Sequence, residues 1–250
     1  MIEPIVDVSH WQGDIDAQKM VSKAIGMYIR AGSIDNNSGI CYEDYRLREN
    51  CTKFSENIPC GYYWYFRPNH DGFKQGEYFA TLIKNASINL PPMVDVETPN
   101  TPWTQSYKKQ LGEFLVIVDK HLPKTSCGIY TRGYYWNDFV EPTLWDDLSL
   151  RPLWVARYNN IATHPWDNNP NSKLRLRPWN DYELWQWSAN SCGAEFGVES
   201  NFIDLNRFNG TLEEFYRFAN WNQPAPENGY CKIIMTIKKI CDNFLREHCE

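Results

Sequence analysis

The sequence lacks the features of a membrane-spanning or exported protein. Its 250 residues contain no run of about 18 apolar residues, so we expect no membrane span. The chain does not open with a basic segment and an apolar core, because the apolar stretch Ile5–Val8 begins almost at once. We therefore expect no signal peptide.

Basic residues and metal-binding motifs are scarce as well. Lys and Arg total 25 against 31 Asp and Glu, and this formal net charge of −6 argues against a nucleic-acid partner. The eight cysteines form no C-x-x-C pair and no Cys/His cluster with zinc spacing. We expect no metal, no cofactor and mostly free thiols. If disulfides form, the candidates are Cys231, Cys241 and Cys249.

Aromatic residues, in contrast, are abundant. The chain has 11 Trp, 15 Tyr and 12 Phe. Many of these rings belong to a core, but a flat apolar ring beside hydrogen-bonding groups also suits a cleft that stacks on sugar rings. Five tryptophans stand beside polar residues near predicted strand ends: Trp64, Trp136, Trp154, Trp185 and Trp187.

A pair of carboxylates lies inside the short apolar run Pro91–Pro99. Prolines interrupt a sheet ladder, so the prolines at both ends of this run predict a buried strand. Alternate residues of a strand share a face, which places Asp95 and Glu97 on one side with Cα atoms about 6.5–7 Å apart. Two carboxylates facing one cavity do not both ionise easily, so the more shielded one can keep a proton and act as a general acid. Two solvated acids at a strand end, or a pair that holds a metal, are the alternatives.

The order of the predicted elements indicates an α/β fold. Strand-like and helix-like segments alternate up to residue 121, whereas the later segments are mostly strand-like. Alternation with right-handed crossovers predicts a parallel barrel, and enzymes built on such barrels gather their functional residues at the carboxyl ends of the strands. Six polar residues fall at or near such ends: Asp7, Asp95, Glu97, Tyr130, Gln186 and Asp204.

Several helices have recognisable boundaries. We expect a helix of roughly ten residues from Asp16, a second over Tyr42–Ser55 and a third capped by Asp71. Two more are expected over Thr104–His121 and Thr211–Ala219.

The chain predicts one catalytic barrel over residues 1–220, without internal repeats. Residues 221–229, rich in Asn and Pro, read as a linker. Residues 230–250 place apolar side chains on one face of an amphipathic helix. This helix either packs back on the barrel or engages a partner chain.

Eight sequence blocks, spanning roughly residues 3–210, resemble the family 25 glycoside hydrolases. These are the Chalaropsis-type lysozymes, which include phage endolysins and bacterial or fungal muramidases. One block would be weak evidence, whereas eight in the family's order are specific. The blocks are Asp7–Gly13 with Ile15–Asp16, Ile29–Gly32, Gly61–Phe66, Met93–Glu97, Ile129–Thr131, Leu153–Tyr158, Leu184–Trp187 and Asp204–Asn206.

The resemblance implies an irregular TIM-like barrel of five β/α units followed by three strands. It also implies hydrolysis of the β-1,4 bond between N-acetylmuramic acid and N-acetylglucosamine in bacterial peptidoglycan. Glu97 matches the family's general acid, Asp95 the residue that assists it, and Asp7 and Asp204 the other cleft carboxylates. Eight residues are expected to bind the substrate: Tyr63, Trp64, Tyr65, Tyr130, Arg157, Tyr158, Trp185 and Gln186.

The nature of the intermediate stays open at this point. It is either a glycosyl-enzyme ester or an oxazolinium ion formed by the substrate's own acetamido group. The second route requires a carboxylate near the acetamide nitrogen, and Asp95 is the candidate.

Two features depart from the family's pattern. Trp64 occupies a position where many relatives have His, which would alter a subsite. The polar segment Asn159–Asp181 is long and should reshape one wall of the cleft. All four acids are present, which argues against an inactive homologue.

Other functions compete with this interpretation. A chitinase-like glycosidase also ends its motif in D-x-E, but it carries further acids where this chain has Leu90 and Met93. A Ser-His-Asp hydrolase is disfavoured because no nucleophile elbow accompanies the five histidines. The main alternative is a non-catalytic glycan-binding or virion structural component that retains the barrel.

The resemblance also leads to an expected place of action. Without a recognised signal peptide, we expect the protein in the host cytoplasm, with release to the cell wall during phage lysis, or in the phage particle.

Overall fold

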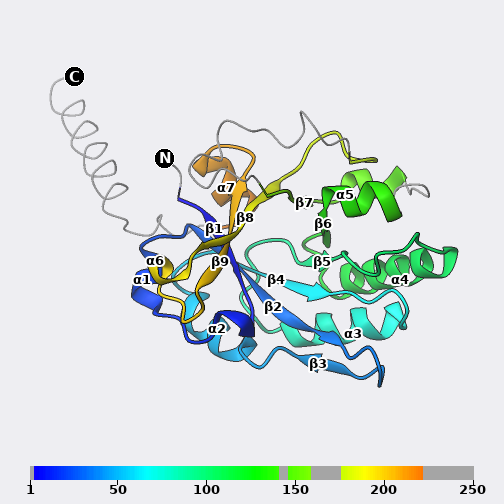
Figure 1. The fold of residues 1–250 in the computed structure, drawn as a ribbon, viewed down its shortest axis with the longest axis horizontal. Helices are drawn as coiled ribbons and strands as arrows, with labels where there is room; N and C mark the ends of the chain where they lie inside the picture. Colours follow the sequence, from blue (N-terminus) through cyan, green and yellow to red (C-terminus); the bar gives the residue numbers. More distant parts are fainter. Residues whose placement is uncertain (1–2, 141–145, 159–175, 222–250) are drawn as a thin grey trace, which may run out of the picture.

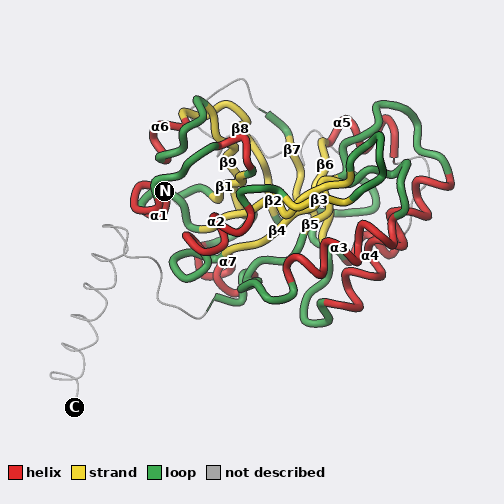
Figure 2. The backbone as a smooth tube through the Cα atoms, turned by 90° about the horizontal axis from the view of Figure 1, so that it is seen from below, coloured by secondary structure: helices red, strands yellow, loops and turns green. Residues whose placement is uncertain are grey.

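The computed structural model describes residues 3–140, 146–158 and 176–221. Eight of its strands close into a barrel, which lies at the centre of the molecule in Figures 1 and 2. Closure occurs at β1, which pairs with both β2 and β9. The barrel strands are β1 (Ile5–Val8), β2 (Gly26–Ile34), β4 (Cys60–Tyr65), β5 (Met93–Asp95), β6 (Gly128–Arg132), β7 (Leu153–Ala156), β8 (Leu184–Cys192) and β9 (Phe202–Phe208).

The strand directions agree with the predicted parallel barrel except at β9, whose antiparallel direction was not predicted. All neighbouring pairs from β1 round to β8 are parallel, and β9 runs antiparallel to both β8 and β1. The prediction of five β/α units followed by three strands is confirmed. Because parallel strands bring their carboxyl ends to one side, polar residues from distant parts of the chain meet there.

The helices lie outside the barrel (Figure 2). Asp71 caps α3 as predicted, and Thr104 and Thr211 cap α4 and α7. The described α-helices are α1 (Ala17–Val21), α2 (Leu47–Phe54), α3 (Gly72–Ile83), α4 (Gln105–His121), α5 (Gly133–Tyr135), α6 (Gly193–Phe196) and α7 (Leu212–Phe218). Shorter elements are the 3-10 helices η1 (His10–Gln12) and η4 (Asp146–Leu150) and the π-helical turn η2 (Trp136–Val140).

The barrel strands bury both of their faces. Alternate residues point to opposite sides, so outward residues such as Val94 pack with the helices, and inward residues such as Met93 fill the barrel. Helix α7 covers the amino ends of the strands with Phe215, which belongs to the inner cluster. A Cβ atom at Gly26, the first residue of β2, would lie 2.7 Å from the Phe215 ring. Glycine at this position therefore permits the close contact that seals this end.

Three boundaries differ from those expected. The predicted helix Tyr42–Ser55 divides into β3 (Cys41–Glu43) and α2, because its first residues pair antiparallel with the end of β2. Helix α1 has only five residues, since the chain turns back into β2 at Gly26. Strand β5 ends at Asp95, so Glu97 stands in the loop beyond it.

Some predictions lie outside the described residues. These are residues 222–229 of the linker, the helix 230–250 and most of the segment 159–181. Trp221, expected to begin the linker, is buried in the inner cluster beside α7. The five cysteines of the described part are free thiols. A search of the same residues finds no helix with the length and apolar character needed to cross a membrane.

Candidate active site

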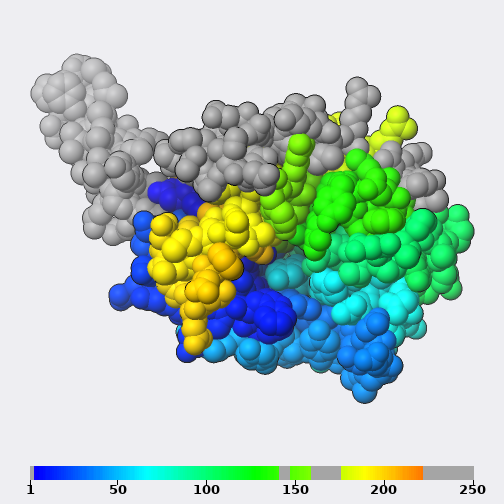
Figure 3. Space-filling model, in the orientation of Figure 1, coloured from blue at the N-terminus to red at the C-terminus, as the bar shows by residue number. Residues whose placement is uncertain are grey.

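A cavity of about 270 Å³ opens at the carboxyl ends of the barrel strands. In Figure 3 the surface is hollowed near the centre of the face shown, between the gold segment and the cyan and blue segments. Asp7, Asp95, Glu97 and Asp204 all contribute to the lining. The structure therefore brings together the four acids that the sequence predicted, from β1, the β5 end and β9.

Asp95 and Glu97 reach the cavity from the same chain segment but have different surroundings. Asp95 is 5% exposed, and its Oδ1 has no hydrogen-bond partner. Glu97 Oε2 accepts a hydrogen bond from Arg132 Nε at 2.7 Å, within an ion pair. Burial raises the pKa of Asp95 well above its ordinary value, and the negative charge of Glu97 adds to this effect. The shielded Asp95 is therefore the member of this pair that favours its protonated form, and Glu97 is ion-paired with Arg132.

Asp7 is held by a chain of hydrogen bonds. Its Oδ2 accepts from Asn206 Nδ2 at 2.8 Å and from Gln186 Nε2 at 2.9 Å. Gln186 Oε1 accepts in turn from the hydroxyl groups of Tyr130 and Tyr158, both at 2.9 Å. These contacts fix the orientation of the carboxylate and of the amide beside it.

Asp204 lies opposite Asp7 in the pairing of β1 with β9. Burial raises the pKa of Asp204 to about 9, and the negative charge of Asp7 adds to this shift. Burial also raises the pKa of Asp7, but the hydrogen bonds from Asn206 and Gln186 oppose that increase. The two carboxyl groups therefore share one proton near neutral pH, and Asp204 is the member that carries it.

Most of the predicted substrate-binding residues also line the cavity. Burial raises the pKa of the Tyr63 and Tyr130 hydroxyls, so both stay uncharged hydrogen-bond donors. The predicted residues found in the lining are Tyr63, Tyr65, Tyr130, Tyr158 and Gln186.

The acids do not form a metal centre. Within the described ranges, no three His, Cys, Asp or Glu side chains are grouped so that they could hold a metal ion. Glu97 is partnered by the guanidinium group of Arg132, and Asp7 by the side-chain amides of Gln186 and Asn206.

Comparison with known proteins assigns the chain to a family. Residues 6–195 match the sequence profile of Glycosyl hydrolases family 25. The chain belongs to this family. It is a glycoside hydrolase, and muramidase activity of the lysozyme type is the function that membership of family 25 supports.

Individual relatives agree with this assignment. Lysozyme M1 from Streptomyces globisporus is 28% identical over 86% of this chain and 70% of its own length. The uncharacterized protein YegX from Escherichia coli strain K12 is 26% identical over 88% of this chain and 75% of its own length.

Solved structures share the fold. The bacterial lysozyme from Streptomyces coelicolor has a TM-score of 0.67 and 23% identity, covering 88% of this chain and 98% of that one. A family 25 glycosyl hydrolase from Bacillus anthracis has a TM-score of 0.68 and 21% identity, covering 87% of this chain and 93% of that one.

Three predicted substrate-binding residues of this family 25 chain do not line the cavity. Trp64 and Trp185 are fully buried on the outward faces of β4 and β8. Their indole N–H groups donate to Gln75 Oε1 at 3.1 Å and to the carbonyl oxygen of Arg157 at 2.9 Å, respectively. Arg157 itself follows β7 and lies outside the lining. The expectation for Trp64 and Trp185 is corrected, because both side chains are fully buried away from the cavity, and the expectation for Arg157 stays a prediction. Trp64 contributes to packing between β4 and α3 rather than to a subsite.

Several residues of the family 25 site were not predicted. Arg132 and Asn206 lie two residues after Tyr130 and Asp204 on their strands, so strand alternation alone could have indicated them. Asn206 Oδ1 also accepts a hydrogen bond from the indole of Trp154, which lines the cavity, at 2.7 Å.

Arg30 is another cavity residue that the sequence did not single out. Its guanidinium lies over the ring of Tyr65, 5.2 Å from the ring centroid. This interaction joins β2 to β4, so no local sequence signal predicts it.

Proposed function

We propose that this glycoside hydrolase is a muramidase that cleaves the β-1,4 bond between N-acetylmuramic acid and N-acetylglucosamine in bacterial peptidoglycan. The observation that carries the proposal is the convergence of Asp7, Asp95, Glu97 and Asp204 on one cavity. Acids with different environments, some protonated and some ionised, are what glycoside hydrolysis requires. Similarity to Lysozyme M1 supports the choice of substrate.

In the proposed reaction, Glu97 is the general acid. The Asp95–Glu97 pair holds one proton, which moves from Asp95 to Glu97 when the substrate fills the cavity. Glu97 then delivers this proton to the glycosidic oxygen as the bond to the anomeric carbon breaks. The different surroundings of the two carboxyl groups support this division of roles.

Asp95 then assists as a carboxylate. It accepts the N–H of the acetamido group, whose carbonyl oxygen attacks the anomeric carbon to give an oxazolinium ion. Water opens this ion and returns a proton to Glu97, which acts as the base in the second step. The absence of any hydrogen-bond partner at Asp95 Oδ1 in the described structure supports a role in binding a substrate donor.

The other predicted residues position the sugar. Asp204, as the protonated member of its pair, shares its proton with Asp7, and the remaining oxygens of the two groups accept hydrogen bonds from sugar hydroxyl groups. The tyrosine rings that line the cavity offer faces on which a sugar ring stacks.

The decisive experiment is digestion of purified peptidoglycan followed by mass spectrometry of the products. We expect new N-acetylmuramic acid reducing ends, and Glu97→Gln should lose more than 99% of the activity, as removal of a general acid costs about 10²–10⁴-fold. Glu56→Gln, at an exposed site, is the matched control and should keep full activity. New N-acetylglucosamine reducing ends would show that the enzyme cleaves the other glycosidic bond of the strand. An active Glu97→Gln would refute the role of Glu97.

A non-catalytic glycan-binding or virion structural role is the alternative. It predicts that the protein sediments with intact cell walls and releases no product over long incubation. Digestion of a wall suspension with the wild-type chain separates the two functions directly.

We also propose the place of action that the sequence led us to expect, which is the cell wall during phage lysis or the phage particle during entry. Detection of the protein in purified particles would support entry, and its detection only in lysates of infected cells would support lysis.

A further inference from the structure

Two large aromatic side chains near the cavity are exposed to solvent. Trp11 and Tyr45 are each 72% exposed. Trp11 belongs to the cavity lining. Large exposed rings of this kind, next to a functional cavity, mark a binding surface.

The ring of His10 joins these two rings into one surface. Its centroid lies 4.6 Å from that of Trp11 and 5.1 Å from that of Tyr45, with interplanar angles of 37° and 38°. We call His10, Trp11 and Tyr45 the aromatic platform. It extends outward from the cavity rim at Trp11 to Tyr45.

Buried Asp44, which is only 2% exposed, holds the platform in place. Its Oδ2 accepts from His10 Nδ1 at 2.6 Å and from the backbone N–H of His10 at 3.2 Å. Its Oδ1 accepts from the backbone N–H of Arg46 at 3.0 Å. One carboxylate thus positions His10 and the turn that carries Tyr45. Because Nδ1 is the donor to Asp44, His10 Nε2 stays available to a ligand.

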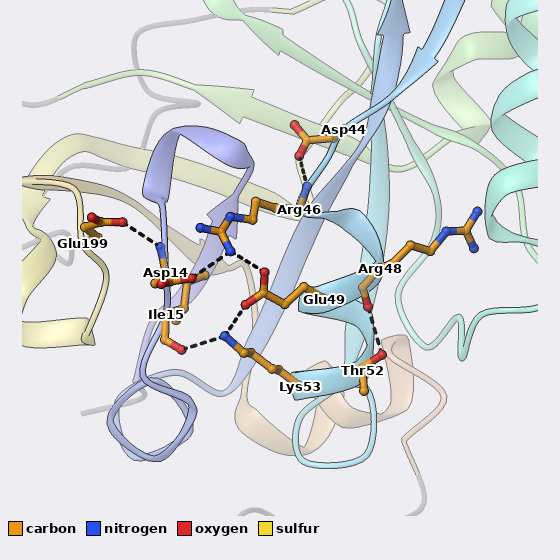
Figure 4. A network of polar contacts seen from close by, with 9 residues as sticks. All are labelled: Asp14, Ile15, Asp44, Arg46, Arg48, Glu49, Thr52, Lys53 and Glu199. Carbon is orange, nitrogen blue, oxygen red and sulfur yellow. Dashed lines mark hydrogen bonds and ion pairs between the residues drawn. The ribbon is translucent and has the colours of Figure 1, made fainter.

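Ion pairs fix the two segments to each other (Figure 4). The guanidinium of Arg46 contacts Asp14 Oδ1 at 2.7 Å and also contacts Glu49. Lys53 continues the network from Glu49 to the carbonyl oxygen of Ile15. The segment that follows β1, with Trp11, is therefore clamped to the start of α2, beside Tyr45. These contacts hold together the two segments that carry the platform, which lowers the entropy cost of ordering them on binding.

The size of the cavity indicates what the platform holds. At about 270 Å³, the cavity is smaller than the roughly 300–1,000 Å³ that a drug-sized ligand fills. A polymeric glycan therefore extends beyond it, and a rim of aromatic rings flanked by polar groups is suited to sugar rings. A protein partner would need far more than three side chains, since stable interfaces bury about 800 Å² per partner.

We propose that the aromatic platform is an additional sugar-binding subsite, which adjoins the catalytic cavity at Trp11 and holds a further saccharide unit of the glycan strand under cleavage. This proposal rests on the proposed function, because it takes the same polymer as its ligand. Tyr45 and Trp11 supply stacking faces. His10 Nε2 and the amide nitrogen of Gln12 supply hydrogen bonds at the rim, whereas Gln12 Oε1 accepts from the backbone N–H of Ser9 at 2.8 Å.

The test compares glycans of two lengths. Substrates are a tetrasaccharide and an octasaccharide of alternating N-acetylglucosamine and N-acetylmuramic acid. For Tyr45→Ala we expect KM on the octasaccharide to rise about 3- to 10-fold with kcat unchanged, and both constants on the tetrasaccharide to stay constant. Tyr45→Phe should restore KM because it keeps the ring. Phe73→Ala, an exposed aromatic on α3, is the matched control.

The outcomes separate the two proposals. If the wild-type chain cleaves the octasaccharide and Tyr45→Ala leaves its KM unchanged, the platform is not a subsite and the muramidase proposal stands. Equal effects on both substrates would likewise overturn the subsite. If the wild-type chain cleaves neither glycan, the proposed function fails. In that case, calorimetry measures the affinity of the octasaccharide for the wild-type and Tyr45→Ala chains. A roughly 3- to 10-fold lower affinity of Tyr45→Ala would support the subsite, and equal affinities would overturn it.

Discussion

At the scale of the residue, the contact between Arg132 and Glu97 fixes the position of the proposed general acid. Nε donates to Oε2 at 2.7 Å from the end of the neighbouring strand β6. We predict that Arg132→Met lowers kcat about 10- to 100-fold with little change in KM, because misplacement of a catalytic group by about 1 Å costs that much. Kinetics on purified peptidoglycan measure the effect. An unchanged kcat in Arg132→Met would show that Glu97 is positioned without Arg132.

The buried carboxyl group of Asp204 makes the stability of the folded chain depend on pH. Its folded-state pKa of about 9 exceeds the value near 3.9 of an unfolded Asp, so between these pH values the folded chain binds more protons. The free energy of unfolding therefore falls as the pH rises from about 4 to about 9. We predict that Asp204→Asn removes this loss and stabilises the chain by about 1–3 kcal/mol at pH 9, with little gain at pH 4.

Urea unfolding at pH 4, pH 7 and pH 9 tests this prediction. Asp147→Asn, at an exposed position, serves as the control and should follow the wild-type curve at every pH. A gain for Asp204→Asn that is the same at all three pH values would contradict the assignment of the proton to Asp204.

At the scale of the element, α7 depends on its capping box. Thr211 Oγ1 accepts from the backbone N–H of Glu214 at 3.2 Å, and Glu214 Oε2 accepts from the backbone N–H of Thr211 at 2.7 Å. We predict that Thr211→Ala lowers the free energy of unfolding by about 1 kcal/mol. Activity at low temperature should not change, because α7 and the cavity lie at opposite ends of the barrel. Denaturant titration measures the loss, and Thr101→Ala in an exposed loop is the control.

The elements could largely be predicted, and the exceptions have physical causes. Strands and capped helices alternate clearly in the sequence, and the family resemblance placed the last three strands. In the strand Gly61–Phe66, almost every position is aromatic. The sequence therefore does not show which side chains point into the barrel and which point toward the helices. Trp64 was placed in the cleft because it stands beside polar residues near a strand end and at a position where many relatives have His, although it faces α3. Strand β3 was missed because Tyr42–Ser55 was interpreted as one helix, whereas Cys41–Glu43 form a hairpin with the end of β2.

At the scale of the whole molecule, the four acids could be predicted because a barrel gathers strand ends. What could not be predicted are the contacts between segments distant in the chain. The pairs His10–Asp44 and Glu97–Arg132 each join residues more than 30 positions apart. The chain carries no local pattern from which such pairs could be predicted, yet they position the Glu97 carboxylate and the His10 ring.

The closure of the barrel by β9 against β1 has a consequence for the synthesis of the enzyme. Asp7 is made among the first residues and Asp204 among the last of the barrel, yet the two face each other across one pairing of strands. A chain still on the ribosome lacks half of this pair until β9 emerges. Unfinished or truncated chains therefore carry no complete catalytic centre, and hydrolytic capacity arises all at once, when translation of the barrel is complete.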